Sequence, residues 1–245
     1  MADEENEQSP FSRPNFIVAA VVVAALVVAG VIVGVNVATR DGGDAQPNPT
    51  SSSTAAPSAE PTADSGGASA CGLDGEELTG TVTTAPQAEW QYQDVYSYPV
   101  SSTAGPAATA PEGYRFCFQH SPTGALFAAA NGMVTALAPD LRAVWLDYSL
   151  SEGTYRNDLL ASAGNETDSE IRASVAGFRV LAYEGDTARI DIAFAGTTAG
   201  QVVTGSVVFE LIWIAGDWKL DGNNPEPARI AQIPNLAGYT PWGAE

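Results

Sequence analysis

Residues 175–220 read VAGFRVLAYEGDTARIDIAFAGTTAGQVVTGSVVFELIWIAGDWKL. The stretch holds three long runs of strand-forming residues separated by turn residues: 175–183, 188–195 and 202–214. In the middle run, Ile190 and Ile192 alternate with Arg189 and Asp191, as in an antiparallel strand that has one face against a core. The pattern therefore predicts an antiparallel sheet with one buried face.

The third run leads into a predicted hairpin. Val207, Phe209 and Leu211 fall on one side of this run because side chains alternate along a strand. Gly216-Asp217 then makes a tight turn into a short fourth run, 218–220. We expect four strands in a meander.

The residues before the sheet predict a helix. Ser121 is a favourable N-cap, and Pro122 takes the first helical position, where its missing N–H costs nothing. Pro139 ends the pattern. Apolar and small residues recur at helical spacing between these limits: Leu126, Ala129, Ala130, Met133 and Leu137.

Two shorter helices are expected next. Asp140 could cap one of them, and Thr154 could cap another that stops near Gly164. The first carries an apolar stripe: Leu141, Val144, Trp145 and Tyr148. Helices this short form by packing on a larger element. Helices followed by a meander of long strands indicate an α+β fold.

An apolar segment near the N-terminus predicts a transmembrane helix. Residues 16–39 read FIVAAVVVAALVVAGVIVGVNVAT, without one charged side chain. As a helix they span about 36 Å, enough for a hydrocarbon core of about 30 Å. A cleaved signal peptide, the alternative, has an apolar region of about 7 to 15 residues behind a basic segment, whereas residues 3–7 are DEENE. We expect residues 1–15 to form a cytoplasmic tail.

Residues 40–70 consist almost wholly of Gly, Pro, Ser, Thr, Ala and Asp, which predicts a disordered linker. Beyond it, Cys71 and Cys117 are the only cysteines, and both follow the apolar segment. A disulfide is expected, which places the C-terminal domain outside the cytoplasm. Two reduced core cysteines are the alternative. A two-cysteine metal site lacks supporting histidines because His120 is alone.

The flanks of the helical and strand region are less regular. Residues 71–120 predict an extended arm with strand-like runs at 78–84 and 90–100 and a short buried strand in YRFCFQH (114–120). Residues 222–245 contain four prolines, so they form neither a regular helix nor a central strand. This tail either packs back on the domain, which we favour, or docks on a partner.

Three stretches carry a resemblance to known proteins: PTGALFAAANGM (122–133), LRAVWLDYSL (141–150) and IAGDWKL (214–220). With the long strands between them, they resemble the nuclear transport factor 2-like fold, a curved sheet around helices, over about residues 121–221. The order of a membrane helix, a Pro-rich linker and such a domain outside the cell resembles actinobacterial-type scaffold subunits of conjugation and type IV secretion systems. HSPTGALFAAANGM (120–133) and the C-terminal GYTPWG (238–243) resemble an uncharacterised family of this kind. This resemblance implies assembly through protein contacts. The long arm and the cysteines depart from the better-known scaffold subunits.

Composition excludes some functions. The formal net charge is −19 and the sole lysine is Lys219, so nucleic acid is a poor partner. No motif for a cofactor, a metal ion or a catalytic triad is present, and His120 is predicted to be a surface or capping residue. We expect a non-enzymatic, single-pass protein of the cell membrane that contacts other subunits. It could form a homo-oligomer through Gly30 and Gly34 of the membrane helix.

The alternative is a ligand-binding or isomerase-like domain. The fold resemblance implies a pocket, because cone-shaped relatives include isomerases and dehydratases that use a buried Asp and Tyr pair. The candidate pocket residues are Trp145, Tyr148, Tyr155 and Asp191. Without a catalytic base, the same pocket would bind an apolar or lipid-like ligand.

Overall fold

The computed structural model describes residues 69–163, 172–198 and 201–244. The chain divides into two units, Met1–Glu60 and Pro61–Glu245, and the described residues belong to the second. The expected membrane helix (16–39) and nearly all of the expected linker (40–70) lie outside the described residues. Within the described ranges, no helix is long and apolar enough to cross a bilayer.

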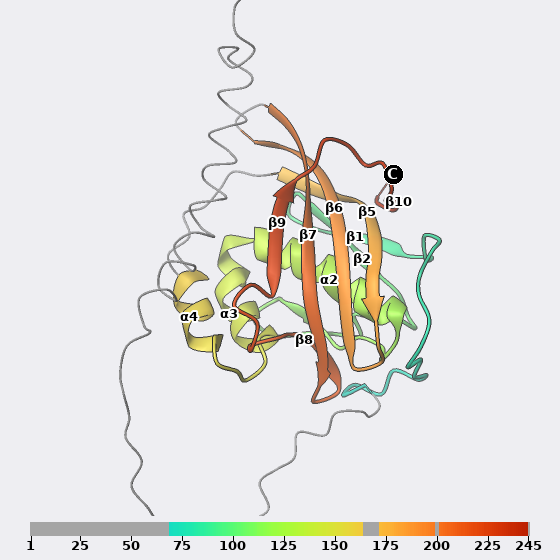
Figure 1. Cartoon of the computed structure of the whole chain (residues 1–245), viewed down its shortest axis with the longest axis vertical. Coiled ribbons are helices and arrows are strands. Elements are labelled where there is room, and N and C mark those ends of the chain that lie inside the picture. Colours follow the sequence, from blue (N-terminus) through green and yellow to red (C-terminus); the bar gives the residue numbers. More distant parts are fainter. Residues whose placement is uncertain (1–68, 164–171, 199–200, 245) are drawn as a thin grey trace, which may run out of the picture. The chain divides into compact units, whose positions relative to one another are not determined.

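The core of the domain is an antiparallel sheet (Figure 1). Its long strands match the three predicted runs and the predicted hairpin: β5 (Arg172–Tyr183), β6 (Thr187–Thr198), β7 (Gln201–Ile214) and β8 (Asp217–Leu220). The strand order is β10-β5-β6-β7-β8, and β9 also pairs with β7. Two strands of the C-terminal tail complete the sheet: β9 (Ala228–Gln232) and β10 (Thr240–Pro241).

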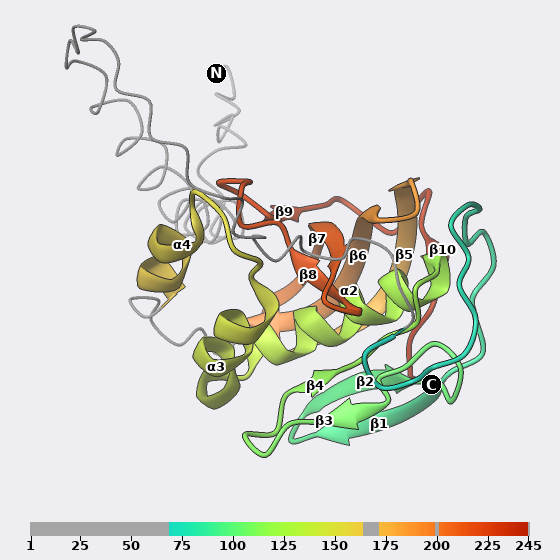
Figure 2. The ribbon, with the colours of Figure 1, turned by 90° about the horizontal axis from the view of Figure 1, so that it is seen from below.

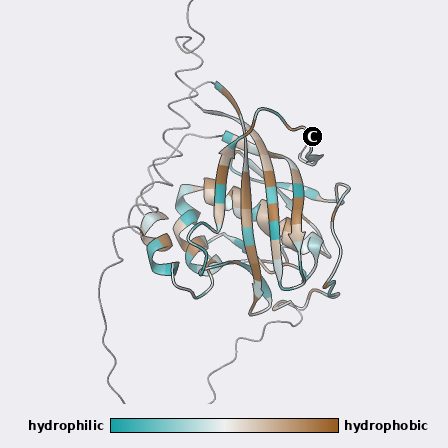
Figure 3. Cartoon of the chain, in the orientation of Figure 1, coloured by the Kyte–Doolittle hydropathy of each residue, from teal (hydrophilic) through white to brown (hydrophobic). Residues whose placement is uncertain are grey.

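The predicted alternation sets which face of the sheet is buried. Ile190 pairs with Phe209 and Ile192 pairs with Val207, and all four side chains belong to the hydrophobic core. Hydrophilic and hydrophobic residues alternate along the strands in Figure 3. The sequence prediction of an α+β fold with a meander is therefore confirmed.

Three helices precede the sheet: α2 (Pro122–Leu137), α3 (Pro139–Ser149) and α4 (Arg156–Ala163). The predicted cap is confirmed, since Ser121 Oγ accepts the Gly124 N–H at 2.9 Å. The predicted cap at Asp140 is wrong. Ala138 is the N-cap residue there and Pro139 starts the helix, so Asp140 falls in the first turn, where a carboxylate interacts favourably with the helix dipole.

The arm differs from its prediction in two places. Residues 90–100 form a hairpin of β1 (Glu89–Gln93) and β2 (Tyr96–Val100) instead of one strand, because Asp94 adopts a φ of 53° that suits a tight turn. Residues 78–84 form no strand. Two short strands pair further on: β3 (Ala108–Thr109) and β4 (Arg115–Phe116). Helix α2 lies between the β1–β2 hairpin and the main sheet (Figure 2).

The C-terminal tail packs back on the domain. Trp242 is 6% exposed, and its ring lies 5.2 Å from that of Trp90, 5.2 Å from that of Phe127 and 5.6 Å from that of Phe178. Its Nε1–H donates to the Pro86 carbonyl at 3.1 Å. One indole thus joins the tail, the arm, α2 and β5.

Replacing Trp242 with Ala tests this junction. Truncation of a buried aromatic ring leaves a cavity, so we expect the free energy of unfolding to fall by about 3 kcal/mol or more. Leu236→Ala is the control, because Leu236 is 37% exposed in the same tail and should cost much less. Urea titration of both variants measures the difference. Equal losses would show that Trp242 does not anchor the tail.

Candidate functional site

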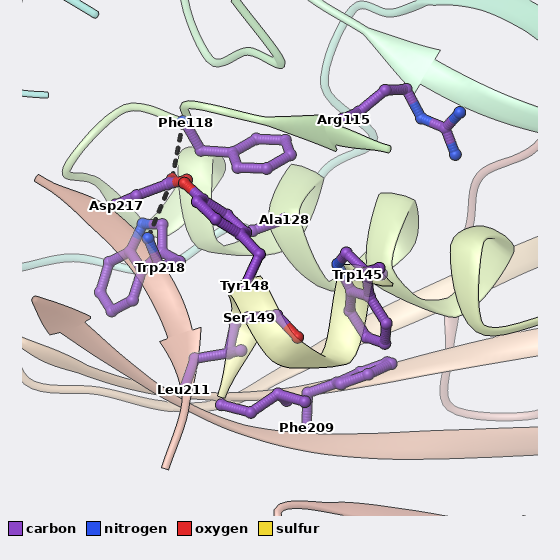
Figure 4. Close-up of a pocket in the computed structure, with 12 residues that line it drawn as sticks. Arg115, Phe118, Ala128, Trp145, Tyr148, Ser149, Phe209, Leu211, Asp217 and Trp218 are labelled. Atoms are coloured by element: carbon purple, nitrogen blue, oxygen red, sulfur yellow. Dashed lines mark hydrogen bonds between the residues drawn. The ribbon is translucent and has the colours of Figure 1, made fainter. Parts of the chain in front are cut away.

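A small pocket lies between α2, α3 and the sheet (Figure 4). Its volume of about 20 Å³ suits one water molecule. The lining combines aromatic and ionisable side chains: Arg115, Phe118, Ala128, Gly132, Trp145, Tyr148, Ser149, Phe209, Leu211, Asp217, Trp218 and Leu220. This mixture makes the pocket a candidate binding site.

Trp145 takes up much of the space between these elements. Its indole is 8% exposed and packs over Gly132 of α2, where an added Cβ would lie 2.9 Å from Trp145 Cζ2. The missing side chain at Gly132 therefore lets the ring lie against the helix backbone. Phe209 from β7 lies beside Trp145 in Figure 4. The apolar part of the pocket is filled by the protein itself.

Asp217 forms the polar part of the pocket and is 2% exposed. Its Oδ1 accepts the backbone N–H groups of Phe118 (3.0 Å) and Trp218 (2.9 Å). Its Oδ2 accepts the backbone N–H of Cys117 at 2.9 Å and the Tyr148 hydroxyl at 2.7 Å. Because four donors engage both oxygens, this carboxylate is held as a structural acceptor and is poorly placed to take a proton from a substrate.

Cys117 sits in an unusual backbone conformation beside this carboxylate. Its φ is 73°, a left-handed value that costs a non-glycine residue energy. Two restraints hold it there: the hydrogen bond to Asp217 and the predicted disulfide to Cys71, which the structure confirms with a Cα–Cα distance of 6.0 Å. The bridge ties the start of the arm to the start of the helical region.

Lys219 and Tyr148 form a second polar pair beside Asp217. Lys219 Nζ lies 2.9 Å from the Tyr148 ring centroid and donates to the Tyr148 carbonyl at 3.1 Å. Burial lowers the pKa of Lys219 to about 8, although the Asp217 charge opposes this shift. Burial, followed by the Asp217 charge, raises the pKa of Tyr148, so its hydroxyl stays a donor.

Arg115 lies at the end of the pocket away from Asp217 and links the β1–β2 hairpin to α2. Its Nε donates to Asn131 Oδ1 at 2.7 Å and its Nη2 to Thr135 Oγ1 at 3.0 Å. Its Nη1 donates to Gln93 Oε1, and its guanidinium lies 3.8 Å from the Tyr98 ring centroid. Burial lowers the pKa of Arg115 to about 10, opposed by Tyr98. All these partners are neutral side chains, and they hold the arginine in a structural role.

The four predicted pocket residues are not brought together. Trp145 and Tyr148 line the pocket. Tyr155 lies in the turn before α4, where its N–H donates to the Gly222 carbonyl at 2.9 Å. Asp191 is 1% exposed and points away from the core that Ile190 and Ile192 face; its carboxylate pairs with Arg179 and accepts the Tyr239 hydroxyl at 2.8 Å.

The prediction that His120 is a surface or capping residue is wrong. The ring is 1% exposed and stacks on Trp213 at 4.1 Å. Its Nδ1 lies 2.9 Å from Glu76 Oε1, and its Nε2 lies 3.1 Å from Asp186 Oδ1. The arm covers the ring, since the Glu77 N–H donates to the His120 carbonyl at 2.8 Å. Nothing in the sequence around FQHSP indicates this long-range cover.

The chemistry open to these residues is narrow. No group of three or more His, Cys, Asp or Glu side chains in the described part of the chain could hold a metal ion. Among the pocket-lining groups, Ser149 Oγ is buried without a hydrogen-bond partner in the described residues. A single water molecule in the pocket would satisfy it. The arrangement suits a polar structural junction.

Comparison with known families gives a match over most of the chain. The family described as Domain of unknown function (DUF8175) matches residues 50–241. No curated protein and no solved structure matches the chain.

Replacing Asp217 with Asn tests the junction. The substitution removes the charge and places an amide NH₂ against donors that need an acceptor, so we expect a loss of about 2 kcal/mol or more in the free energy of unfolding. Asp140→Asn, an exposed change in the first turn of α3, should cost only a few tenths of a kcal/mol. Urea unfolding compares them. Equal stability of the two variants would contradict the structural role of Asp217.

The lowered pKa of Lys219 predicts a pH dependence of stability. The pKa is about 8 in the folded state and 10.5 at its ordinary value, so the unfolded chain binds more protons between these values. The stability of the wild type relative to Lys219→Met should therefore rise from pH 7 to pH 10, by at most about 3 kcal/mol. Denaturant unfolding at both pH values measures it. A relative stability that falls over this range would contradict the prediction.

Proposed function

The chain belongs to the DUF8175 family, and from its structure and sequence we propose that it is a membrane-anchored assembly module outside the cytoplasm. In this proposal, residues 16–39 hold the chain in the membrane and the folded domain contacts other protein subunits. The function is structural, within an apparatus of the conjugative transfer or type IV secretion type. That last assignment rests on the sequence resemblance.

The observation that carries the proposal is the filled interior. The pocket has room for about one water molecule, Trp145 occupies its apolar part, and Asp217 is engaged by four donors. A substrate or lipid site needs a much larger cavity, of about 300 Å³ or more. A wider hollow of about 240 Å³ beside Arg189 and Glu210 is more open to the surface, so we infer that the domain contacts its partners there or elsewhere on its surface.

The order of elements supports a nuclear transport factor 2-like fold for the domain. Three helices are followed by the antiparallel strands β5 to β8, as the resemblance implies. A short parallel bridge between Leu150 and Leu220 links the end of α3 to β8 at the edge of the sheet.

The disulfide supports a location outside the cytoplasm. Cys71 and Cys117 are bridged, and such bridges persist in oxidising compartments. The proposed anchor precedes Cys71 by a segment long enough to keep the domain clear of the lipid headgroups.

One observation favours a second candidate function, a small-molecule binding domain of the same fold. Ser149 Oγ is buried, has no partner among the described residues and lines the pocket. Such a site would require Trp145 to swing out of the pocket. A Trp145→Ala variant that gains affinity for an apolar probe would show only that the space can be opened, so binding by the wild type is the relevant measurement.

Membrane fractionation with cross-linking tests the proposal. We expect the full-length chain to stay in the pellet after an alkaline wash, and deletion of residues 16–39 to release it. A membrane-impermeant maleimide should label Cys71, which is exposed, in intact cells only after reduction. Photo-cross-linking from the domain surface should then recover defined membrane-complex subunits. Soluble wild-type protein with two freely alkylated thiols, or a domain that cross-links to no subunit, would overturn the proposal.

A further inference from the structure

The two edges of the main sheet differ in how far other segments cover them. The β5 edge is covered: the Trp242 N–H donates to the Ala176 carbonyl at 3.3 Å, and the Tyr183 hydroxyl donates to the Glu77 carbonyl at 2.6 Å. Its ladder with β6 also contains two register shifts, after Val175 and after Val180. Covering strands and bulges are common ways to prevent unwanted pairing at a sheet edge.

The β9 edge has no covering strand and no bulge in the part of the chain that the structure describes. All five residues of β9 are exposed, β9 pairs only with β7, and their register is unbroken. Figure 1 shows β9 as the left margin of the sheet, opposite β5 and β10. The short length of β9 and its flanking prolines limit how far another strand can pair, but its exposed backbone is open to one short strand.

The hydrogen-bond register identifies which groups of β9 are free. The Glu210 N–H donates to the Pro227 carbonyl at 2.8 Å, and the Ile233 N–H donates to the Thr204 carbonyl at 3.1 Å. In an antiparallel ladder, hydrogen-bonded residues alternate with residues whose backbone groups point the other way. The odd-numbered residues of β9 therefore face β7.

The even-numbered residues consequently offer their backbone to the open side. Ala228, Ile230 and Gln232 each direct an N–H and a C=O away from β7. None of these three side chains is charged, and Ile230 is 54% exposed. A neighbouring strand would pair with these groups and cover Ile230.

We propose that two copies of this chain pair through β9, antiparallel, with the twofold axis at Ile230. In this register, Ile230 lies opposite its own copy and Ala228 lies opposite Gln232. The interface is isologous, because each copy presents the same donors and acceptors to the other. The two main sheets then join into one, and the two Ile230 side chains cover each other.

The charges near β9 allow this pairing. Arg229 is the one charged residue of β9, and its Nη2 lies 3.9 Å from Glu210 Oε1 of β7, so no unpaired charge has to be buried. Pro227 and Pro234 flank the strand and limit it to a short segment, which suits weak self-association. The net charge of −19 on each copy repels the other, so the dimer strengthens as salt is added. A basic foreign strand would show the opposite salt dependence.

The inference rests on the proposed assembly function and names one contact surface for it. A cysteine at the axis tests it in the full-length chain. Ile230→Cys should form a disulfide-linked dimer under mild oxidation, since paired residues in such a ladder lie about 5.5 Å apart at Cα. The native cysteines are bridged and do not interfere. Val202→Cys is the control, because Val202 is 83% exposed and lies outside β9.

A proline variant separates pairing from folding. Ile230→Pro removes an N–H that faces the open side and keeps the bonds to β7, whereas Ala231→Pro removes an N–H that faces β7 and should lower the melting temperature. We expect Ile230→Pro to melt near the wild type but to self-associate at least about tenfold more weakly in sedimentation, because the dimer loses two backbone hydrogen bonds. Cross-linking no greater than at Val202, or unchanged association of Ile230→Pro, would overturn the inference. Either result would exclude pairing through β9 without excluding the proposed assembly function, which would then use another surface.

Discussion

The buried Asp217 carboxylate is the contact on which the rest of the domain depends. It is the first residue of β8, yet it accepts the backbone N–H groups of Cys117 and Phe118, about a hundred residues earlier. It also accepts the Tyr148 hydroxyl from α3. A buried carboxylate costs several kcal/mol in desolvation unless such donors surround it. Its satisfaction therefore requires the arm, α3 and the sheet to be in place together.

The same contact sets the start of the helical layer. Fixing Cys117 in a left-handed conformation turns the chain from β4 toward Ser121, whose side chain caps α2. The disulfide to Cys71 and the enclosure of His120 by Glu76 then hold the arm across this turn. Helix α2 can consequently be apolar on nearly all sides, because the sheet covers one face and the hairpin covers another.

Sequence reasoning found the parts of the fold that local chemistry determines. Runs of strand-forming residues and the turns between them predicted β5 to β8, and the Ser121 cap predicted the start of α2, since these signals act over a few residues. The hairpin within 90–100 turns at Asp94, which the strand-like run does not mark as a turn. The burial of His120 depends on contacts far apart in sequence, which leave no periodic trace. In the candidate site, the helical stripe predicted Trp145 and Tyr148 as neighbours. The sequence does not indicate the long-range hydrogen bonds of Asp217, because Gly216-Asp217 also matches an ordinary turn.

The hydrogen-bonding groups of the pocket and those of β9 differ in whether they have partners within the domain. In the described pocket, polar side chains bind one another and Trp145 fills the remaining space, so little interaction free energy is left for a ligand. At β9 the situation is reversed, because the backbone groups of Ala228, Ile230 and Gln232 bind only water until another strand arrives. Replacing that water gives a modest net free energy per hydrogen bond, so pairing at this edge is reversible. Reversible strand pairing is what we propose for a subunit that assembles with others, and the closely packed pocket region would give that edge a rigid support.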